Sequence, residues 1–173
     1  MRRWQVLEVW VKEHGWTRGA ELGVFQGATF LYLLERCPQL TLIGVDTWTP
    51  QPDKQVLYAE GGRSYAAFDL ERFAREVASK AAVFGDRAIL YRGLTVDVAQ
   101  LVPDASLDFV FIDADHLEEG VRSDITAWRC KVRAGGVLCG HDYQQCFPGV
   151  RCAVDDLCRG FTLHDDTVWA VTV

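Results

Sequence analysis

Acidic and histidine side chains recur in this sequence at the ends of short apolar segments. Four segments share this feature, and the residues concerned are Glu21, Asp46, Asp113, His116, His141 and Asp142. Carboxylates accept hydrogen bonds from hydroxyl groups and attract cations, and a histidine accepts a proton near neutral pH. A single aspartate at such a place often only caps the following helix. Because four segment ends agree, we predict one polar ligand site.

The turn after Glu21 indicates which ligand to expect. It reads E-L-G-V-F-Q-G, and Gly23 and Gly27 remove side chains where a turn must approach a ligand closely. A dinucleotide site would read G-x-G-x-x-G, and an acid beside the turn repels a pyrophosphate but attracts a cation. Asp46, 25 residues after Glu21, suits two ribose hydroxyls. We therefore expect a ligand with a ribose and a positive group.

The elements that position these residues alternate along the chain. Five apolar runs are expected to be strands covered on both faces: 18–22, 40–45, 88–93, 107–112 and 135–140. Helical patterns separate them, such as Val121, Ile125 and Trp128 after the fourth run. This alternation predicts an open, mostly parallel α/β sheet, closed by an antiparallel β-hairpin over residues 160–173. Ligands bind such sheets at the carboxyl ends of the strands, where the acids and histidines lie.

Length, charge and cysteine content narrow the class of protein. The 173 residues suit one domain, and about half of them are apolar. A net charge of −6 without a long Lys or Arg run argues against nucleic acid as a partner. No apolar run approaches the roughly 20 residues of a membrane span, and residues 1–16 predict a short amphipathic helix rather than a signal peptide. Six cysteines without a C-x-x-C pair indicate reduced thiols, so we expect a cytoplasmic protein.

Four segments in this order resemble the class I S-adenosylmethionine (SAM)-dependent methyltransferases, in particular a small bacterial branch similar to macrocin-type O-methyltransferases. They read "AELGVFQGATF", "LIGVDTW", "LDFVFIDADHLEEGVRSDITAW" and "VRAGGVLCGHDY". The resemblance implies a Rossmann-like, seven-stranded, mostly parallel doubly wound sheet with a C-terminal antiparallel hairpin. It covers nearly the whole chain as a single domain, with an N-terminal helix in 1–16 and a cofactor-binding core in 17–173.

The resemblance also implies a set of cofactor contacts. The residues expected to contact SAM are Glu21, Gly23, Gly27, Asp46, Thr47, Trp48, Thr95 and Asp113. Glu21 would lie near the methionine ammonium group, Asp46 on the ribose, and Trp48 or its neighbours near adenine. Relatives often carry an acid for the adenine amino group after the third strand. Here the segment reads "RGLTVD", so Leu94 takes the place of that acid and backbone groups or Thr95 would read the adenine.

Two alternatives remain for catalysis at the expected acceptor hydroxyl. Asp113, His141 and Asp142 offer ligands for Mg²⁺ or another divalent metal, which would lower the pKa of the hydroxyl. Imidazole is softer than the ligands that Mg²⁺ prefers, so His116 or His141 acting directly as general base is the other alternative. The candidate catalytic residues are therefore Asp113, His116 and His141. Asp115 would assist either mechanism or cap the next helix.

We expect a methyltransferase that acts on a small molecule or sugar, with O-methylation favoured. The alternatives are a nicotinamide-dependent oxidoreductase and a non-catalytic module that binds SAM without turnover. The acceptor pocket is expected from residues 47–65, residues 143–152 or a second subunit, so a homodimer is one expectation. No membrane partner is expected. Asp124, Asp155 and Asp156 are interpreted as a solvated helix surface.

Overall fold

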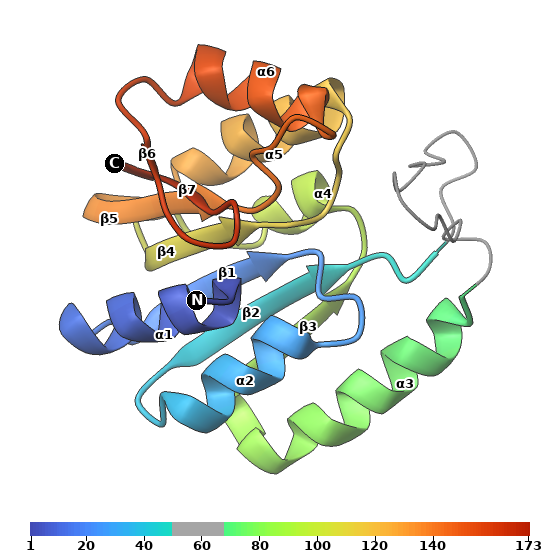
Figure 1. The fold of residues 1–173 in the computed structure, drawn as a ribbon. Coiled ribbons are helices and arrows are strands. Elements are labelled where there is room, and N and C mark those ends of the chain that lie inside the picture. Colours follow the sequence, from blue (N-terminus) through green and yellow to red (C-terminus); the bar gives the residue numbers. More distant parts are fainter. Residues whose placement is uncertain (50–67) are drawn as a thin grey trace.

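The computed structural model describes residues 1–49 and 68–173 (Figure 1). The elements in chain order are α1 (Arg3–Glu13), β1 (Arg18–Leu22), α2 (Ala28–Arg36), β2 (Thr41–Asp46), α3 (Leu70–Ala81), the 3-10 helix η2 (Ala82–Arg87), β3 (Ala88–Arg92), α4 (Thr95–Ala99), β4 (Leu107–Ile112), α5 (Glu118–Arg129), β5 (Val132–Gly140), α6 (Pro148–Leu157), β6 (Thr162–Leu163) and β7 (Trp169–Thr172). Most of the expected loop 47–65 lies outside the described residues.

The described strands form one seven-stranded sheet with the order β3-β2-β1-β4-β5-β7-β6. The first five strands in that order are parallel, and β7 pairs antiparallel with both β5 and β6. The chain order reverses between β1 and β4, which are neighbours in the sheet. Ligands in open α/β sheets bind at such a switch point, outside the carboxyl ends of the strands. The predicted fold class is confirmed.

Helices cover both faces of the sheet, as Figure 1 shows. Helices α1, α2 and α3 pack on one face, around a core that includes Leu7, Phe30 and Val77. Helices α4, α5 and α6 pack on the other face, around a second core that includes Trp128 and Val154. Both cores are built from apolar residues spaced three or four apart along each helix, which is the spacing that places side chains on one helix face.

The fifth strand begins earlier than expected. We predicted residues 135–140, but β5 starts at Val132, which pairs with Leu107 of β4. The pairing register then shifts through Gly135 and Gly136. Gly135 has φ +75°, and a Cβ on Gly136 would lie 2.5 Å from the carbonyl oxygen of Asp108. The expected strand began at this glycine pair, but the pair lies at an irregularity inside a longer strand.

The predicted N-terminal helix forms over Arg3–Glu13 and buries Val6, Leu7 and Val11. Glu8 fastens this helix to α2, since its carboxylate accepts hydrogen bonds from the Tyr32 hydroxyl and the Arg36 guanidinium. Among the described residues, no helix has the length and apolar character needed to cross a membrane. The six cysteines all lie in the described ranges and are all free thiols.

Candidate active site

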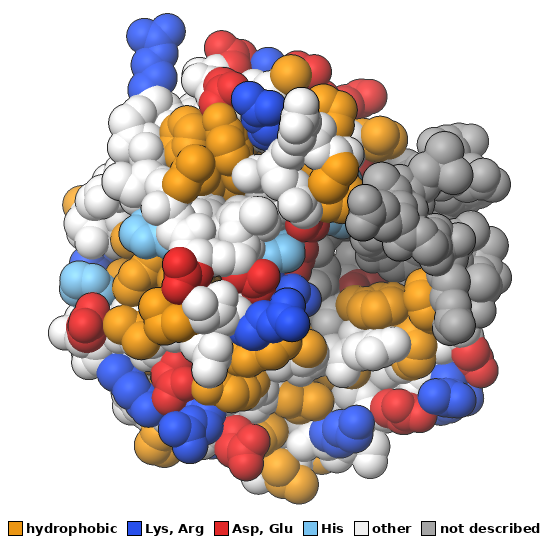
Figure 2. Space-filling model, in the orientation of Figure 1, with side chains coloured by type: hydrophobic (Ala, Val, Ile, Leu, Met, Phe, Trp, Pro, Cys, Tyr) orange, Lys and Arg blue, Asp and Glu red, His pale blue; other side chains and the backbone are white. Residues whose placement is uncertain are grey.

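A cavity of about 460 Å³ lies at the carboxyl ends of β1, β2 and β4. The predicted site residues that line it are Gly23, Asp46, Thr47, Thr95, Asp113 and His116. Seen in the orientation of Figure 1, acidic and histidine side chains gather beside a Lys or Arg side chain near the middle of the face in Figure 2. These residues come from four segments far apart in sequence. Of the strand-end residues, Asp46, Asp113 and His116 line the cavity, whereas Glu21, His141 and Asp142 are not among the described residues that do.

The backbone conformation of the turn between β1 and α2 requires its two glycines, Gly23 and Gly27. Gly23 has φ +90°, and a Cβ there would lie 2.1 Å from the carbonyl oxygen of Asp113. Gly27 has φ +78° and stands at the N-cap of α2, where a Cβ would meet Leu31 and Val77 at 3.1 Å. Gly23 lines the cavity, but Gly27 is not among the described residues that do. A glycine is required there by the positive φ of the turn and by the close packing of Leu31 and Val77.

Asp46 is held at the end of β2 by backbone donors. Its carboxylate accepts from the N–H of Phe25 and from the N–H of Trp48, each at 2.7 Å. Burial raises the pKa of Asp46, and these backbone N–H groups oppose that effect. A carboxylate has about four lone-pair sites, so two accepted bonds leave capacity for ligand hydroxyls.

Trp48 does not occupy the position that was expected for it. Its side chain is buried in the core of the α1–α3 face, and its indole N–H donates to the carbonyl of Phe25 at 2.8 Å. It is not among the described residues that line the cavity, whereas Thr47 is. Trp48 therefore positions Phe25 and Asp46, and of the expected pair Thr47 and Trp48 only Thr47 presents its side of the chain to the cavity.

Glu21 lies deeper than the cavity lining. Its side chain is 3% exposed, and its Oε2 has no hydrogen-bond partner among the described residues. Burial raises the pKa of Glu21 well above its usual range, and the nearby charge of Asp113 adds to that effect. Glu21 is thus a buried polar group at the end of β1 that is not among the described residues lining the cavity.

Asp124 is a cavity residue that sequence reasoning missed. We interpreted it as part of a solvated helix surface, but it is 3% exposed and lines the cavity from α5. Asp155 and Asp156 are exposed as expected. The Thr95 hydroxyl donates to the Asp124 carboxylate, and the Trp128 indole N–H donates to the Thr95 carbonyl at 3.1 Å. The sequence contained a signal of its burial, because Asp124 falls on the same face of α5 as its buried apolar residues.

His116 and Asp142 form a buried pair between the ends of β4 and β5. Nε2 of His116 lies 2.6 Å from Oδ2 of Asp142, and both residues are 8% exposed. The Phe147 ring stacks on the imidazole with centroids 4.6 Å apart. Burial would raise the pKa of Asp142, but His116 and His141 outweigh burial and hold it below its usual range. The carboxylate thus fixes the orientation of the imidazole, and this contact favours the tautomer that carries its proton on Nε2.

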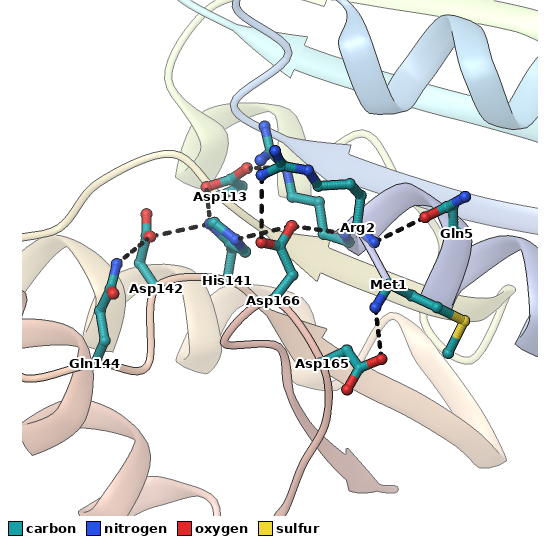
Figure 3. Close-up of polar contacts among 10 residues, drawn as sticks. Met1, Arg2, Gln5, Asp113, His141, Asp142, Gln144, Asp165 and Asp166 are labelled. Atoms are coloured by element: carbon teal, nitrogen blue, oxygen red, sulfur yellow. Dashed lines mark hydrogen bonds and ion pairs between the residues drawn. The ribbon is translucent and has the colours of Figure 1, made fainter.

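His141 faces a second set of acids. Its Nδ1 lies 3.0 Å from Oδ1 of Asp142 and 3.6 Å from Oδ1 of Asp113, and its Nε2 lies 3.8 Å from Oδ2 of Asp166. Figure 3 shows this imidazole between these acids. Burial would lower the pKa of His141, but Asp113 and Asp142 outweigh burial and raise it to about 9. His141 lines a small neighbouring cavity, with Asp113 and His116.

The predicted metal ligands lie together, but they already have partners within the chain. Asp113, His141 and Asp142 offer ligand atoms that are all within 4.8 Å of one another. Oδ2 of Asp113 lies 3.2 Å from Nε of Arg3, and Oδ2 of Asp142 is held by His116. Mg²⁺ prefers six oxygen ligands, and here two carboxylates already pair with cationic or donor groups. The set fits a network of internal ion pairs better than a metal centre.

Comparison with known proteins gives one family and many solved relatives. The family model described as "Methyltransferase domain" matches residues 20–143. No protein with a curated description matches the chain. The structure of the O-methyltransferase TomG from Streptomyces achromogenes, in complex with SAM, has a TM-score of 0.66 at 17% identity and covers 99% of this chain and 79% of that one.

Two further solved structures have the same fold. An O-methyltransferase from Bacillus cereus, in complex with SAH, has a TM-score of 0.66 at 17% identity, and the match covers 99% of this chain and 80% of that one. The O-methyltransferase NovP has a TM-score of 0.72 at 18% identity, with 98% and 78% covered. The matched residues 20–143 include the glycine turn, Asp46, Asp113 and His116 of the site described above.

Proposed function

We infer the reaction from the premise that this chain belongs to the methyltransferase domain family and is a methyltransferase. We propose that it transfers the methyl group of SAM to an oxygen atom of a small molecule or sugar. The observation that carries this proposal is that Asp46 and His116 line the same cavity. One is suited to ribose hydroxyls and the other to the proton of an acceptor hydroxyl. The solved relatives named above, described as O-methyltransferases, support the choice of oxygen.

The ribose and the cationic centre of SAM suit the β1 and β2 side of the cavity. The backbone N–H groups of Phe25 and Trp48 hold the Asp46 carboxylate in place. The ribose hydroxyls could therefore donate hydrogen bonds to it without a rearrangement of the side chain. Gly23 lets the backbone approach the ligand, since no side chain covers that part of the wall. Asp113 also lines this region, although its Oδ2 is already paired with Arg3.

We assign the adenine end of the cavity to Thr95 and Asp124. The exocyclic amine of adenine is a hydrogen-bond donor, so it requires acceptors. Because the Thr95 hydroxyl donates a hydrogen bond to the Asp124 carboxylate, the Thr95 oxygen and the carboxylate both keep acceptor lone pairs. Asp124 thus supplies the carboxylate that Leu94 does not, from helix α5 instead of the segment after β3.

For the transfer step we assign His116 as general base and Asp142 as its positioning residue. SAM supplies an already activated methyl group when it is bound. In this assignment the hydrogen bond to Asp142 keeps the proton of the neutral imidazole on Nε2 of His116. Nδ1 is then the nitrogen that accepts the proton of the acceptor hydroxyl. The oxygen lone pair then forms the new bond to the methyl carbon as the bond from that carbon to sulfur breaks.

Residues next to this base would form the acceptor side. Phe147 stacks on His116, so the segment that follows β5 flanks the place where an acceptor hydroxyl must lie. We therefore keep the proposal that residues 143–152 contribute to the acceptor pocket. We propose that a second copy of the protein in a homodimer completes the pocket. Most of the other segment expected to contribute, residues 47–65, lies outside the described residues.

A transfer assay tests this proposal. Purified protein is incubated with SAM that carries an isotope-labelled methyl group and with a panel of sugars, phenols, amines and carboxylic acids, and the products are identified by mass spectrometry. The proposal expects label on hydroxyl oxygens. Label only on nitrogen would overturn the assignment of oxygen. Binding of SAM without turnover of any acceptor would favour a non-catalytic SAM-binding module.

A further inference from the structure

The N-terminal segment reaches the polar centre described above. The backbone N–H of Arg3 donates to Oδ2 of Asp166 at 2.8 Å, and a terminal nitrogen of Arg2 lies 3.9 Å from Oδ1 of the same residue. Figure 3 shows Met1 beside Asp165, the preceding residue in the turn between β6 and β7. These contacts join the start of α1 to that turn and hold Arg3 beside the ends of β4 and β5.

The guanidinium of Arg3 lies among the acids of the site. Its Nε lies 3.2 Å from Oδ2 of Asp113, and the side chain of Asp113 is only 12% exposed. The same charge reaches Glu21, where burial and Asp113 raise the pKa and Arg3 is the largest effect that opposes them. One guanidinium therefore interacts with two buried or nearly buried carboxylates.

We propose that Arg3 fills the cation position of this acidic cluster, so that no divalent metal binds between Asp113, His141 and Asp142 while Arg3 is in place. A guanidinium is a permanent cation in proteins, as a metal ion is. A metal bound to Asp113 would have to displace Arg3 from Oδ2 or lie close to its positive charge. Both costs oppose binding.

This assignment gives the N-terminal helix a role in the site. Arg3 is anchored through its own backbone and through the docking of α1 on α2, so its side chain is directed at Asp113 before any ligand arrives. The inference rests on the proposed function only in treating the cluster as part of the transfer site. Metal binding is measured without turnover, so a failure of one proposal is distinguishable from a failure of the other.

Calorimetric titration with Mn²⁺ alone tests the inference, with electron paramagnetic resonance to count bound ions. The proteins are the wild type, Arg3→Gln, Asp113→Asn, and the double variant Arg3→Gln with Asp113→Asn. Arg2→Gln is the matched control. It removes a positive charge from the same segment, but the ion pair of Arg2 is with Asp166 and not with Asp113. We expect Arg3→Gln to bind one additional Mn²⁺ at least tenfold more tightly than the wild type or Arg2→Gln. The double variant should lose that ion.

Two results would overturn the inference. One is a Mn²⁺ ion on the wild type that Asp113→Asn removes. The other is a folded Arg3→Gln variant, judged by circular dichroism, that gains no binding dependent on Asp113. If Arg3→Gln does not fold, the comparison of the wild type with Asp113→Asn decides alone, since the inference requires that their Mn²⁺ isotherms coincide.

Discussion

Nε2 of His116 lies 2.6 Å from Oδ2 of Asp142, and this buried contact joins the carboxyl ends of β4 and β5 at the wall of the cavity. The two residues of this pair have different roles. His116 lines the cavity and can take a proton, whereas Asp142 is not among the described residues that line it and acts through the imidazole. The two residues should therefore differ when they are changed.

His116→Ala should lower kcat by at least about a hundredfold, the usual lower range for loss of a general base, and leave the affinity for SAM unchanged. Added imidazole should restore part of the activity, because it can enter the space that the side chain leaves. Steady-state kinetics and calorimetry measure both effects. His164→Ala, at an exposed histidine, is the control. Unchanged kcat in His116→Ala would contradict the assignment of the base.

Asp124→Asn should weaken the discrimination between adenine and hypoxanthine in the cofactor. The wild type is expected to bind S-adenosylhomocysteine at least tenfold more tightly than S-inosylhomocysteine, since the inosine base lacks the exocyclic amine that Asp124 would bind. In Asp124→Asn the two affinities should approach each other, and the exposed Asp156→Asn should behave as wild type. Equal discrimination in Asp124→Asn and wild type would remove Asp124 from the adenine site.

Gly23→Ala should destabilise the protein more than Gly160→Ala does. Both glycines have a positive φ, +90° and +80°, which costs a side chain roughly 1–2 kcal/mol. At Gly23 the new Cβ would also lie 2.1 Å from a backbone oxygen, whereas no atom lies within 4 Å at Gly160. We expect an additional loss of about 2 kcal/mol or more in the free energy of unfolding, measured by urea denaturation. Equal losses would show that the turn has room for a side chain.

Glu8 should make stability depend on pH below about 4.5. Hydrogen bonds from Lys12 and Tyr32 lower its pKa from 4.5 to about 2 in the folded protein. Because the folded pKa is depressed, the contribution of Glu8 is complete above pH 4.5 and is lost as the pH falls toward 2. Between pH 5 and pH 3 the Tm of Glu8→Gln should therefore fall less than that of the wild type. The control is Glu13→Gln, on the same helix, in which Tm should fall with pH as it does in the wild type. If Tm falls equally in the wild type, Glu8→Gln and Glu13→Gln, the role assigned to Glu8 is wrong.

Local patterns in the sequence predicted the strands and their polar ends well. The segments 18–22 and 107–112 coincide with β1 and β4. Short apolar runs bounded by polar groups are typical of strands covered on both faces. The same reasoning brought Asp46, Asp113 and His116 to one cavity, since parallel strands end at one edge of the sheet.

Contacts between distant segments were not predicted. Asp124 lies on the stripe that Val121, Ile125 and Trp128 define, but its partner Thr95 belongs to another helix. The pairing of Arg3 with Asp113 joins residues that lie far apart in the chain, and no local pattern of either segment indicates it. Such contacts depend on how helices and strands pack, which periodicity does not report.

The most direct test of the account is calorimetric binding of SAM, S-adenosylhomocysteine and NADH to the wild type and to Asp46→Asn. We predict that the first two bind the wild type in the micromolar range, about −8 kcal/mol, and that Asp46→Asn weakens both by at least tenfold. NADH should not bind. Binding of NADH without binding of SAM would contradict the central claim, because it would place a pyrophosphate at the Glu21 turn.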